Sequence, residues 1–370
     1  MKKLLFVTGT RADFGKLEPL ASAAVKNGYS VTFFVTGMHM IERYGLTKEE
    51  VHRNKIFDVV EFINQRSGDP LDIILSKTII GFSDFVKEFK PDLVLVHGDR
   101  IEALASCIVC STNYIRCIHI EGGEVSGTID EQFRHCNTKL ASDHLVSSSS
   151  ARERILRLGE NENAVHVIGS PELDIHSQDS GVSMNQVRER YSIRAEDYGI
   201  CIFHPVTSEL DTIGLQAKKL FGCLKTSNQY FVVILPNNDP GSSHILKEIE
   251  ELSKDQFRVL PSIRFNYFSE LMKNASIIVG NSSMGVREAP FLGIPSINIG
   301  SRQLNRSTAS SIQHINGNNL SMLNEILENF WGKSYPRSEQ FGDGGSCDAF
   351  IKILESGKLW KKPPQKYFVD

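Results

Sequence analysis

The chain has 370 residues, with 41 Lys and Arg against 44 Asp and Glu and a formal net charge of -3. Because the charges nearly balance, the chain lacks the excess of basic residues that is typical of proteins that bind nucleic acid or an anionic membrane. We therefore expect a small molecule as partner. The length is sufficient for two α/β domains that each bury a core. At the start, the apolar run Leu4–Val7 is too short for a signal-peptide core or a membrane span, which predicts a cytoplasmic protein.

Short apolar runs alternate with helical patterns along the whole chain, which predicts βαβ units around parallel sheets. The expected strands are Leu4–Thr8, Val31–Thr36, Leu93–His97, Cys117–Ile120, His144–Ser147, Val165–Ile168, Ile200–Phe203, Phe231–Leu235, Arg258–Leu260, Ile277–Val279 and Pro295–Ile299. A polar stretch, Ser177–Glu196, interrupts the pattern and places a domain boundary between residues 175 and 195. We therefore predict domains 1–180 and 181–345, facing each other across a cleft, and a C-terminal helix and tail, 346–370.

The seven cysteines form no convincing metal or redox motif. Cys107 and Cys110 formally match CxxC, but they fall within an apolar helical pattern, Ile101–Cys110, and no second pair follows. Buried, reduced thiols are the expectation for a cytosolic chain. The serines Ser147–Ser150 predict a cap for a helix at Ala151–Leu158.

The segment Gly9–Leu17 lies between the first strand and a helix and resembles a phosphate-binding loop. Five residues separate Gly9 from Gly15 where the Walker pattern needs four, and Leu17 replaces the metal-binding Ser or Thr. This spacing argues against an ATPase. Two interpretations stay open, an anion-binding turn that includes Arg11 and a plain tight turn.

Acidic residues follow the predicted strands between His97 and His135 more often than a structural role needs. They are Asp99, Glu121 and Asp130. Residues just past the carboxyl ends of parallel strands point into the ligand crevice, where proton-transfer carboxylates belong. Histidines share this region, at 97, 119, 135 and 144, but their spacing follows no ligand rule such as HExxH, so we predict neither a metal nor a cofactor.

The run Gly280–Glu288 is the strongest candidate phosphate site. Its glycine permits a close backbone approach, and its serines offer an N-cap to a helix beginning near Ser282, whose free N–H groups and dipole would hold a diphosphate. Glu288, a turn and a half inside that helix, would accept hydrogen bonds from ribose hydroxyls. Ordinary capping with a solvated glutamate is the alternative. His204, after the strand Ile200–Phe203, is predicted to donate to a phosphate or to cap a loop.

Ordered motifs along almost the entire chain resemble those of the hydrolysing UDP-N-acetylglucosamine 2-epimerases of sialic acid biosynthesis. They are Thr8–Leu17, Val35–Met40, His97–Arg100, His119–Glu124, Ser126–Asp130, Ile168–Pro171, Phe203–Thr207, Pro236–Asp239, Pro261–Arg264, Gly280–Ser283, Val286–Pro290 and Arg302–Gln303. The resemblance implies a GT-B-like α/β fold of two Rossmann-type domains with parallel sheets, whose C-terminal helix crosses back to the N-terminal domain. It also implies a homodimer or homotetramer.

The implied reaction converts UDP-N-acetylglucosamine and water to UDP and N-acetylmannosamine. A base removes the C2 proton while UDP leaves C1, which gives a 2-acetamidoglucal; water then adds at C1, and C2 is reprotonated on the opposite face. By motif, Asp99, Glu121 and Asp130 correspond to the catalytic acids and bases. The residues that correspond to the UDP-binding set are Arg11, Arg100, His204, Asn237, Ser282, Ser283, Glu288 and Arg302. Gly15 stands where some relatives carry serine.

Other functions remain compatible with these residues. A glycosyltransferase would share the fold and a UDP site, but it gives no reason for three carboxylate motifs in the N-terminal half. A non-hydrolysing epimerase would return UDP-N-acetylmannosamine, and a related hydrolysing enzyme would act on UDP-2,4-diacetamido-trideoxyglucose for legionaminic acid. A non-catalytic sugar-nucleotide sensor would keep the serines and Glu288 without needing the three carboxylates.

Overall fold

A computed structural model describes residues 1–42, 45–66, 68–126, 130–237, 239–363, 365–367 and 369. The chain divides into two compact units. Unit 1 comprises Met1–Glu124, Ile129–Asp174 and Gly342–Asp370, and unit 2 comprises Val125–Thr128 and Ile175–Phe341. The predicted domain boundaries after residues 180 and 345 stay predictions.

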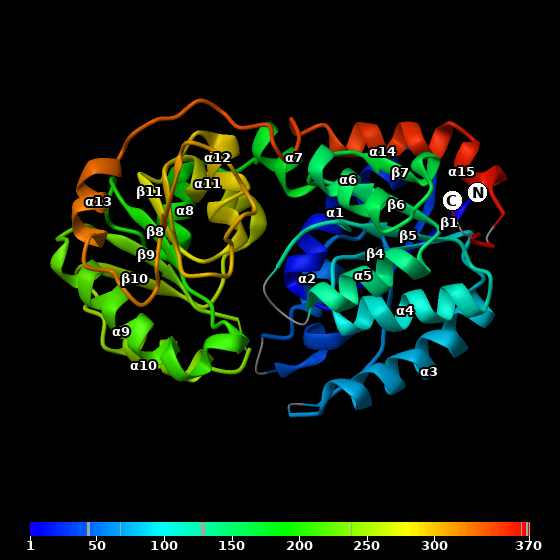
Figure 1. The fold of residues 1–370 in the computed structure, drawn as a ribbon, viewed down its shortest axis with the longest axis horizontal. Helices are drawn as coiled ribbons and strands as arrows, with labels where there is room; N and C mark the ends of the chain where they lie inside the picture. Colours follow the sequence, from blue (N-terminus) through cyan, green and yellow to red (C-terminus); the bar gives the residue numbers. More distant parts are fainter. Residues whose placement is uncertain are drawn as a thin grey trace. The chain divides into compact units, whose positions relative to one another are not determined.

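Unit 1 is built on a parallel seven-stranded sheet with the order β3-β2-β1-β4-β5-β6-β7 (Figure 1). Its strands are β1 (Lys3–Thr8), β2 (Ser30–Val35), β3 (Asp58–Glu61), β4 (Leu93–His97), β5 (Cys117–Ile120), β6 (Asp143–Val146) and β7 (Val165–Val167). Its helices are α1 (Arg11–Lys26), α2 (Lys48–Arg53), α3 (Leu71–Phe89), α4 (Ile101–Thr112), α5 (Asp130–Leu140), α6 (Ser149–Arg157), α14 (Ser346–Glu355) and α15 (Lys358–Lys361), with 3-10 turns η1 (Gly37–Met40) and η3 (Glu162–Ala164). Helix α7 (Glu172–Ser177) runs from unit 1 into unit 2.

Helices cover both faces of this sheet because successive strand residues alternate between the faces. Leu4 and Phe6 of β1 pack with α1, α2 and α14, whereas Leu5 and Val7 pack with α3 and α4. Such strands are buried on both sides, which explains why they appear in the sequence as continuous apolar runs. Helix α14 packs directly on α1, so residues from both ends of the sequence share one core.

Unit 2 repeats this plan with a parallel six-stranded sheet in the order β10-β9-β8-β11-β12-β13 (Figure 1). Its strands are β8 (Gly199–Ile202), β9 (Phe231–Ile234), β10 (Phe257–Leu260), β11 (Ile277–Gly280), β12 (Ser296–Ile299) and β13 (Ile312–Ile315). Helices α9 (Leu210–Thr226), α10 (Ser242–Glu250) and α13 (Leu323–Phe330) cover one face, and α8 (Met184–Tyr191), α11 (Phe265–Lys273) and α12 (Glu288–Leu292) cover the other. Two 3-10 turns, η4 (Thr207–Glu209) and η5 (Ser283–Gly285), lie at strand ends.

The predicted fold class, two α/β units with parallel sheets, is confirmed. Every strand expected from the apolar runs is present within one or two residues of its predicted bounds. The edge strands β3 and β13 were not predicted, and α8 forms inside the stretch Ser177–Glu196 that was predicted only as an interruption. The cysteines are free thiols as expected; Cys107, Cys110, Cys117 and Cys201 are buried, but Cys136 is exposed, contrary to the prediction for the set.

The strand order reverses in each unit at one place. In unit 1 the chain winds outward from β1 to β3 and then resumes on the other side with β4; in unit 2 the same reversal separates β8 from β11. The crevice at such a switch point, beyond the carboxyl ends of the strands, is the usual ligand site of doubly wound sheets. Within the described residues, no helix combines the length and apolar character needed to cross a lipid bilayer.

Candidate active site

The switch point of unit 1 brings together the turn after β1 and the loop after β4. Thr10 caps α1 by accepting a hydrogen bond from the Asp13 backbone N–H at 3.2 Å, so Arg11 is the first helical residue. The Arg11 guanidinium is not isolated, because its Nε lies 2.9 Å from Glu50 Oε2. The segment Gly9–Leu17 is therefore a capped helix start, and anion binding by it stays a prediction.

Glu121 is the centre of a buried polar cluster directly after β5. Its side chain is 6% exposed; Lys16 Nζ lies 2.7 Å and His97 Nε2 lies 3.1 Å from its Oε2. The Ser170 hydroxyl donates to Oε1 at 2.5 Å. Lys16 also reaches Oε2 of Glu172 at 3.0 Å, so one ammonium bridges two carboxylates. Several donors, two of them on titratable cations, favour the anionic form of Glu121.

The backbone of Glu121 adds a second unusual feature. Its φ is +60°, in the left-handed region that costs a residue with a side chain about 1–2 kcal/mol. Such strain persists only where the surroundings hold the residue in place, and it concentrates at functional sites. The Glu121 carboxylate is thus aimed by the backbone and fixed by its hydrogen bonds.

His97, the last residue of β4, links two carboxylates. Its Nδ1 lies 3.3 Å from Asp13 Oδ1, and its Nε2 hydrogen-bonds to Glu121. Burial opposes the charged ring, but the hydrogen bonds to Asp13 and Glu121 outweigh it and raise the pKa of His97 to about 9. Burial likewise raises the pKa of Asp13, yet the hydrogen bond and charge of His97 leave that pKa below its ordinary value. His97 is therefore an imidazolium at neutral pH.

Asp99 and Asp130 occupy different surroundings from Glu121. Asp99, in the loop after β4, is ion-paired with Arg134 of α5, and its side chain is 27% exposed. Asp130 is the first residue of α5, and residues 127–129 of its predicted motif lie outside the described residues. Arg100, the N-cap of α4, places its Nη2 3.6 Å from the Met38 sulfur and its Nε 3.7 Å from Glu102. The prediction of catalytic roles for the three carboxylates is not tested by these contacts.

His204 and Asn281 join the switch-point loops of unit 2. The His204 N–H donates to Asn281 Oδ1 at 2.7 Å, and Asn281 Nδ2 donates back to the His204 carbonyl at 2.8 Å. Arg302 Nη1 donates to the Asn281 carbonyl at 3.0 Å, and the Asn237 N–H donates to His204 Nδ1 at 3.0 Å. Three predicted UDP-binding residues, His204, Asn237 and Arg302, thus meet around Asn281, which the prediction omitted although it lies inside a quoted motif.

The protonation of His204 follows from these contacts. Burial, reinforced by the charge of Arg302, lowers the pKa of His204 to about 3, so the ring is neutral. Because Nδ1 accepts from the Asn237 backbone, the ring proton resides on Nε2. The ring can therefore donate one hydrogen bond, and its predicted donation to a phosphate stays a prediction.

The turn after β11 differs from its prediction. A single helix beginning near Ser282 is wrong: residues Ser283–Gly285 form the 3-10 turn η5, and α12 begins only at Glu288. Pro290 explains the break, because a proline lacks the N–H that would bond to the carbonyl of Val286 and its ring would clash there. Glu288 therefore starts a helix of five residues rather than lying a turn and a half inside a longer one.

Glu288 already has a protein partner. Its Oε1 lies 3.0 Å from His176 Nε2, and the other ring nitrogen of His176 lies 2.9 Å from the Ser269 hydroxyl. The backbone at position 280 requires a glycine, because its φ is +131° and a Cβ there would lie 2.0 Å from the Ile202 carbonyl oxygen. Ser282 and Ser283 remain half-buried at this switch point. Their predicted contact with a diphosphate stays a prediction.

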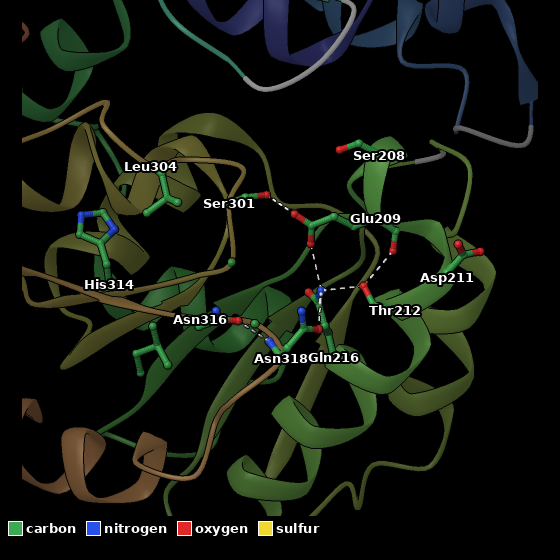
Figure 2. Close-up of a pocket in the computed structure, with 13 residues that line it drawn as sticks. Ser208, Glu209, Asp211, Thr212, Gln216, Ser301, Leu304, His314, Asn316 and Asn318 are labelled. Carbon is green, nitrogen blue, oxygen red and sulfur yellow. Dashed lines mark hydrogen bonds between the residues drawn. The ribbon is translucent and has the colours of Figure 1, made fainter.

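A pocket of about 550 Å³ opens in unit 2 beside these loops, at the ends of β12 and β13 and the start of α9 (Figure 2). Figure 2 shows Glu209 accepting hydrogen bonds from Ser301 and, at 2.9 Å, from Gln216. The lining residues are Ser208, Glu209, Asp211, Thr212, Gln216, Gly300, Ser301, Leu304, His314, Ile315, Asn316, Gly317 and Asn318. They include no lysine or arginine and none of the predicted site residues, so the pocket is poorly suited to a diphosphate.

Histidines and carboxylates meet at several places, but not in a metal-binding arrangement. Within the described residues, no group of three or more His, Cys, Asp and Glu side chains is placed to hold a metal ion. His119 has a protein role instead, since its Nε2 donates to the Gly98 carbonyl at 2.7 Å. Burial, only partly offset by this hydrogen bond, lowers the pKa of His119 to about 3.

The fold first defines the broad class of the protein. A Staphylococcus aureus MnaA–UDP co-structure superposes with a TM-score of 0.81 at 20% identity and covers 99% of this chain and 100% of that one. This likeness is one of fold, and with the two doubly wound units it confirms the predicted GT-B-like class.

Sequence comparison then defines the family. A family model described as UDP-N-acetylglucosamine 2-epimerase matches residues 22–355. The UDP-N-acetylglucosamine 2-epimerase of Neisseria meningitidis serogroup B is 40% identical over 375 aligned residues, covering 100% of this chain and 99% of that protein. The chain belongs to the UDP-N-acetylglucosamine 2-epimerase family.

Two further relatives carry different names. The UDP-N,N'-diacetylbacillosamine 2-epimerase (hydrolyzing) of Legionella pneumophila is 29% identical and covers 96% of each chain. The polysialic acid biosynthesis protein P7 of Escherichia coli is 32% identical, over 84% of this chain and 82% of that protein. The broader family predicted from the motifs, that of the UDP-N-acetylglucosamine 2-epimerases, is thus confirmed, whereas the hydrolysing subtype and the role in sialic acid biosynthesis stay predictions.

Proposed function

We propose that the chain is a hydrolysing 2-epimerase, which converts UDP-N-acetylglucosamine and water to UDP and N-acetylmannosamine for the synthesis of a sialic acid. The observation that carries the proposal is the Glu121 cluster, in which a buried carboxylate on strained backbone is held by Lys16, His97 and Ser170. An anionic, fixed carboxylate is suited to remove the proton from C2.

The rest of the reaction follows from the chemistry of the proposed substrate. As the C2 proton leaves, the C1–O bond to UDP breaks and a 2-acetamidoglucal forms; water then adds at C1, and a proton returns to C2 from the opposite face. This second proton transfer requires another group, for which Asp99 and Asp130 are the proposed candidates. The groups proposed to bind the UDP leaving group are Arg11, Arg100, His204, Asn237, Ser282, Ser283, Glu288 and Arg302.

The relatives support a hydrolysing reaction without deciding the sugar. The Legionella relative is named as hydrolyzing, and the Escherichia coli relative is named for polysialic acid biosynthesis. The Legionella name also favours a second candidate, hydrolysis and epimerisation of a UDP-2,4-diacetamido-trideoxy sugar. The two candidates share the C2 chemistry and differ only in the substituents at C4 and C6.

One incubation tests both candidates and the non-hydrolysing alternative. The protein is given UDP-N-acetylglucosamine or the 2,4-diacetamido substrate in deuterated water, and the products are analysed by NMR and mass spectrometry. We expect free UDP and N-acetylmannosamine with deuterium at C2. Accumulation of UDP-N-acetylmannosamine would contradict the hydrolysing reaction, and turnover of the 2,4-diacetamido sugar alone would replace the proposed substrate.

A further inference from the structure

Glu102 is a buried carboxylate that the proposed chemistry does not use. It lies in the first turn of α4 and is 1% exposed. Neither of its carboxylate oxygens has a hydrogen-bond partner among the described residues. Withdrawing a carboxylate from water without hydrogen bonds is unfavourable, so such a group calls for an explanation beyond packing.

Two glycines make room for this side chain. A Cβ on Gly9, after β1, would lie 3.1 Å from both Cδ and Oε2 of Glu102. A Cβ on Gly37, after β2, would lie 2.7 Å from its Oε1. The Gly9 carbonyl also accepts a hydrogen bond from the Met38 N–H at 2.8 Å, so the turn after β1 and the turn after β2 are hydrogen-bonded to each other beside the carboxylate. The ends of β1 and β2 are therefore shaped around Glu102.

The same carboxylate lies beside Arg100. Glu102 Oε2 lies 3.7 Å from Arg100 Nε, and the Arg100 Nη2 contacts the Met38 sulfur on the second turn. The Arg100 side chain remains 36% exposed, whereas that of Glu102 is 2% exposed. One end of the ion pair is thus fixed inside the unit while the other reaches the surface.

We propose that Glu102 is a positioning residue, which holds Arg100 and the Gly9–Arg11 turn in the arrangement that binds the diphosphate of the nucleotide. This inference rests on the proposed function, because Arg11 and Arg100 are residues proposed to bind UDP. The Glu102 carboxylate attracts the Arg100 guanidinium toward one direction, and its bulk sets the path of the turn that precedes Arg11. Ordering these groups before the nucleotide arrives reduces the entropic cost of binding.

The first test compares Glu102→Gln and Glu102→Asp with the wild type by calorimetric titration of UDP and by steady-state kinetics on UDP-N-acetylglucosamine. For Glu102→Gln, which keeps the shape but removes the charge, we expect UDP affinity to fall about tenfold and KM to rise by a similar factor. We expect kcat to stay within about threefold, because Glu102 does not touch the reacting atoms. Glu102→Asp, which keeps the charge, is expected to retain most of the affinity.

A matched control is Glu18→Gln on α1. Glu18 is a half-buried carboxylate that accepts a hydrogen bond from Asn54 at 3.0 Å, and it belongs to none of the proposed binding residues. We expect unchanged UDP affinity for it. A folded Glu102→Gln protein with wild-type UDP affinity and KM, even if it melts at a lower temperature, would reduce Glu102 to a structural residue and overturn the proposal.

A second test avoids reliance on one variant. Alanine at Gly9 meets no backbone conflict, since its φ is not in the left-handed region, and the nearest atoms to the new Cβ all belong to Glu102. Gly9→Ala should therefore displace Glu102 and also weaken UDP binding, whereas in a Glu102→Ala background the same change should have little further effect. If Gly9→Ala weakens UDP binding by the same factor in the wild type and in the Glu102→Ala background, the effects are additive and the proposal is overturned. This comparison does not depend on whether Glu102→Gln folds.

The result is separable from the proposed reaction. UDP binding is measured without turnover, so a wild-type protein that binds UDP but releases none from UDP-N-acetylglucosamine would contradict the proposed function. The affinity comparison among the Glu102 variants would still decide whether Glu102 positions the diphosphate-binding groups.

Discussion

Glu121 combines features that are costly to the fold with features that suit the catalytic role proposed for it. It is buried, it occupies the left-handed backbone region, and its carboxylate lies against Lys16 and His97. Burial removes the side chain from water, and the backbone conformation and the two contacts restrict its rotation. Together they give a carboxylate held in one direction, and general-base catalysis requires such a positioned proton acceptor.

Replacing Glu121 by glutamine should therefore separate chemistry from binding. The amide keeps the shape but cannot accept a proton, so we expect turnover to fall by a factor on the order of 10² to 10⁴, with UDP affinity near that of the wild type. Asp99→Asn and Asp130→Asn should behave alike if they complete the proton transfers. Stopped assays of UDP release are the measurement, with exposed Glu153→Gln as control; near-normal turnover in any of the three would remove that residue from the mechanism.

The partners of Glu121 illustrate what the sequence leaves open. The position of a carboxylate after an apolar run was enough to predict Glu121. Lys16 and Ser170, however, lie 105 and 49 residues away, and Glu172 lies 3.0 Å from the same Lys16 ammonium. No periodicity links such distant positions, because their meeting depends on which strands are neighbours. The resemblance assigned a role to the three carboxylates, whereas Lys16, His97 and Ser170, although inside its motifs, received none.

His97 gives the stability of unit 1 a pH dependence of known sign. Its pKa is about 9 in the folded chain against about 6.5 when unfolded, so its contribution is complete below about pH 6.5 and disappears as the pH rises through 9. Between pH 6.5 and 9.5 we expect the wild type to lose on the order of 1–3 kcal/mol more unfolding free energy than His97→Gln. Urea titrations at both pH values measure this, with exposed His135→Gln as control; parallel losses in all three proteins would argue against a charged His97.

At the scale of elements, the turn after β11 depends on Gly280. Its positive φ and the approach of the Ile202 carbonyl leave no room for a Cβ. Gly280→Ala should destabilise unit 2 by on the order of 2–4 kcal/mol and, by shifting the turn, weaken the UDP binding proposed for Ser282 and Ser283. Gly222→Ala is a suitable control, because a Cβ at that helical position meets nothing within 4 Å and should stabilise α9 by about 0.5–1 kcal/mol. Equal unfolding midpoints for the two variants would contradict this account.

Some elements were predicted correctly from the sequence and others were not, for reasons that lie in their burial and in their prolines. Buried strands gave continuous apolar runs and were found, whereas β3, with the sequence Asp-Val-Val-Glu, and the half-exposed β13 carry too few apolar residues to stand out. The helix expected from Ser282 was wrong because its serines and glycine were given more weight than Pro290. A proline in the first turn is compatible with a helix that begins at Glu288, but not with one that already runs through Val286.

At the scale of the whole molecule, the residues after α14 are tied to unit 1 by buried charge. Lys366 Nζ lies 2.5 Å from Glu160 Oε2, and Lys362 Nζ lies 2.5 Å from Asp143 Oδ1, although both carboxylates are almost completely buried. Burial raises the pKa of Glu160, but hydrogen bonds from His144, Lys366 and Lys139 outweigh it and lower that pKa to about 2. The two lysines therefore neutralise carboxylates that would otherwise be buried with less compensation.

Removing both cations should loosen unit 1 selectively. For Lys362→Met combined with Lys366→Met we expect a loss on the order of 3 kcal/mol, because an uncompensated buried charge is more costly than an absent pair. Hydrogen exchange should accelerate in β6, β7 and α14, while β8 to β11 of unit 2 keep their protection. Lys361→Met, at an exposed neighbouring position, is the control, and uniform acceleration across both units would refute a local role.

The division of unit 1 into separate stretches of sequence has a consequence for the order of events during synthesis. Residues 1–174 leave the ribosome before unit 2 does, yet α14 and the lysines that neutralise Asp143 and Glu160 follow only after residue 341. The core of unit 2 lies within residues 175–341 and can close as that stretch emerges. The sheet that carries Glu121 must wait with an uncovered apolar face on α1 and without the tail lysines that pair with Asp143 and Glu160. The nascent chain is therefore most exposed to aggregation at its beginning, and the half proposed to perform the chemistry is the last to mature.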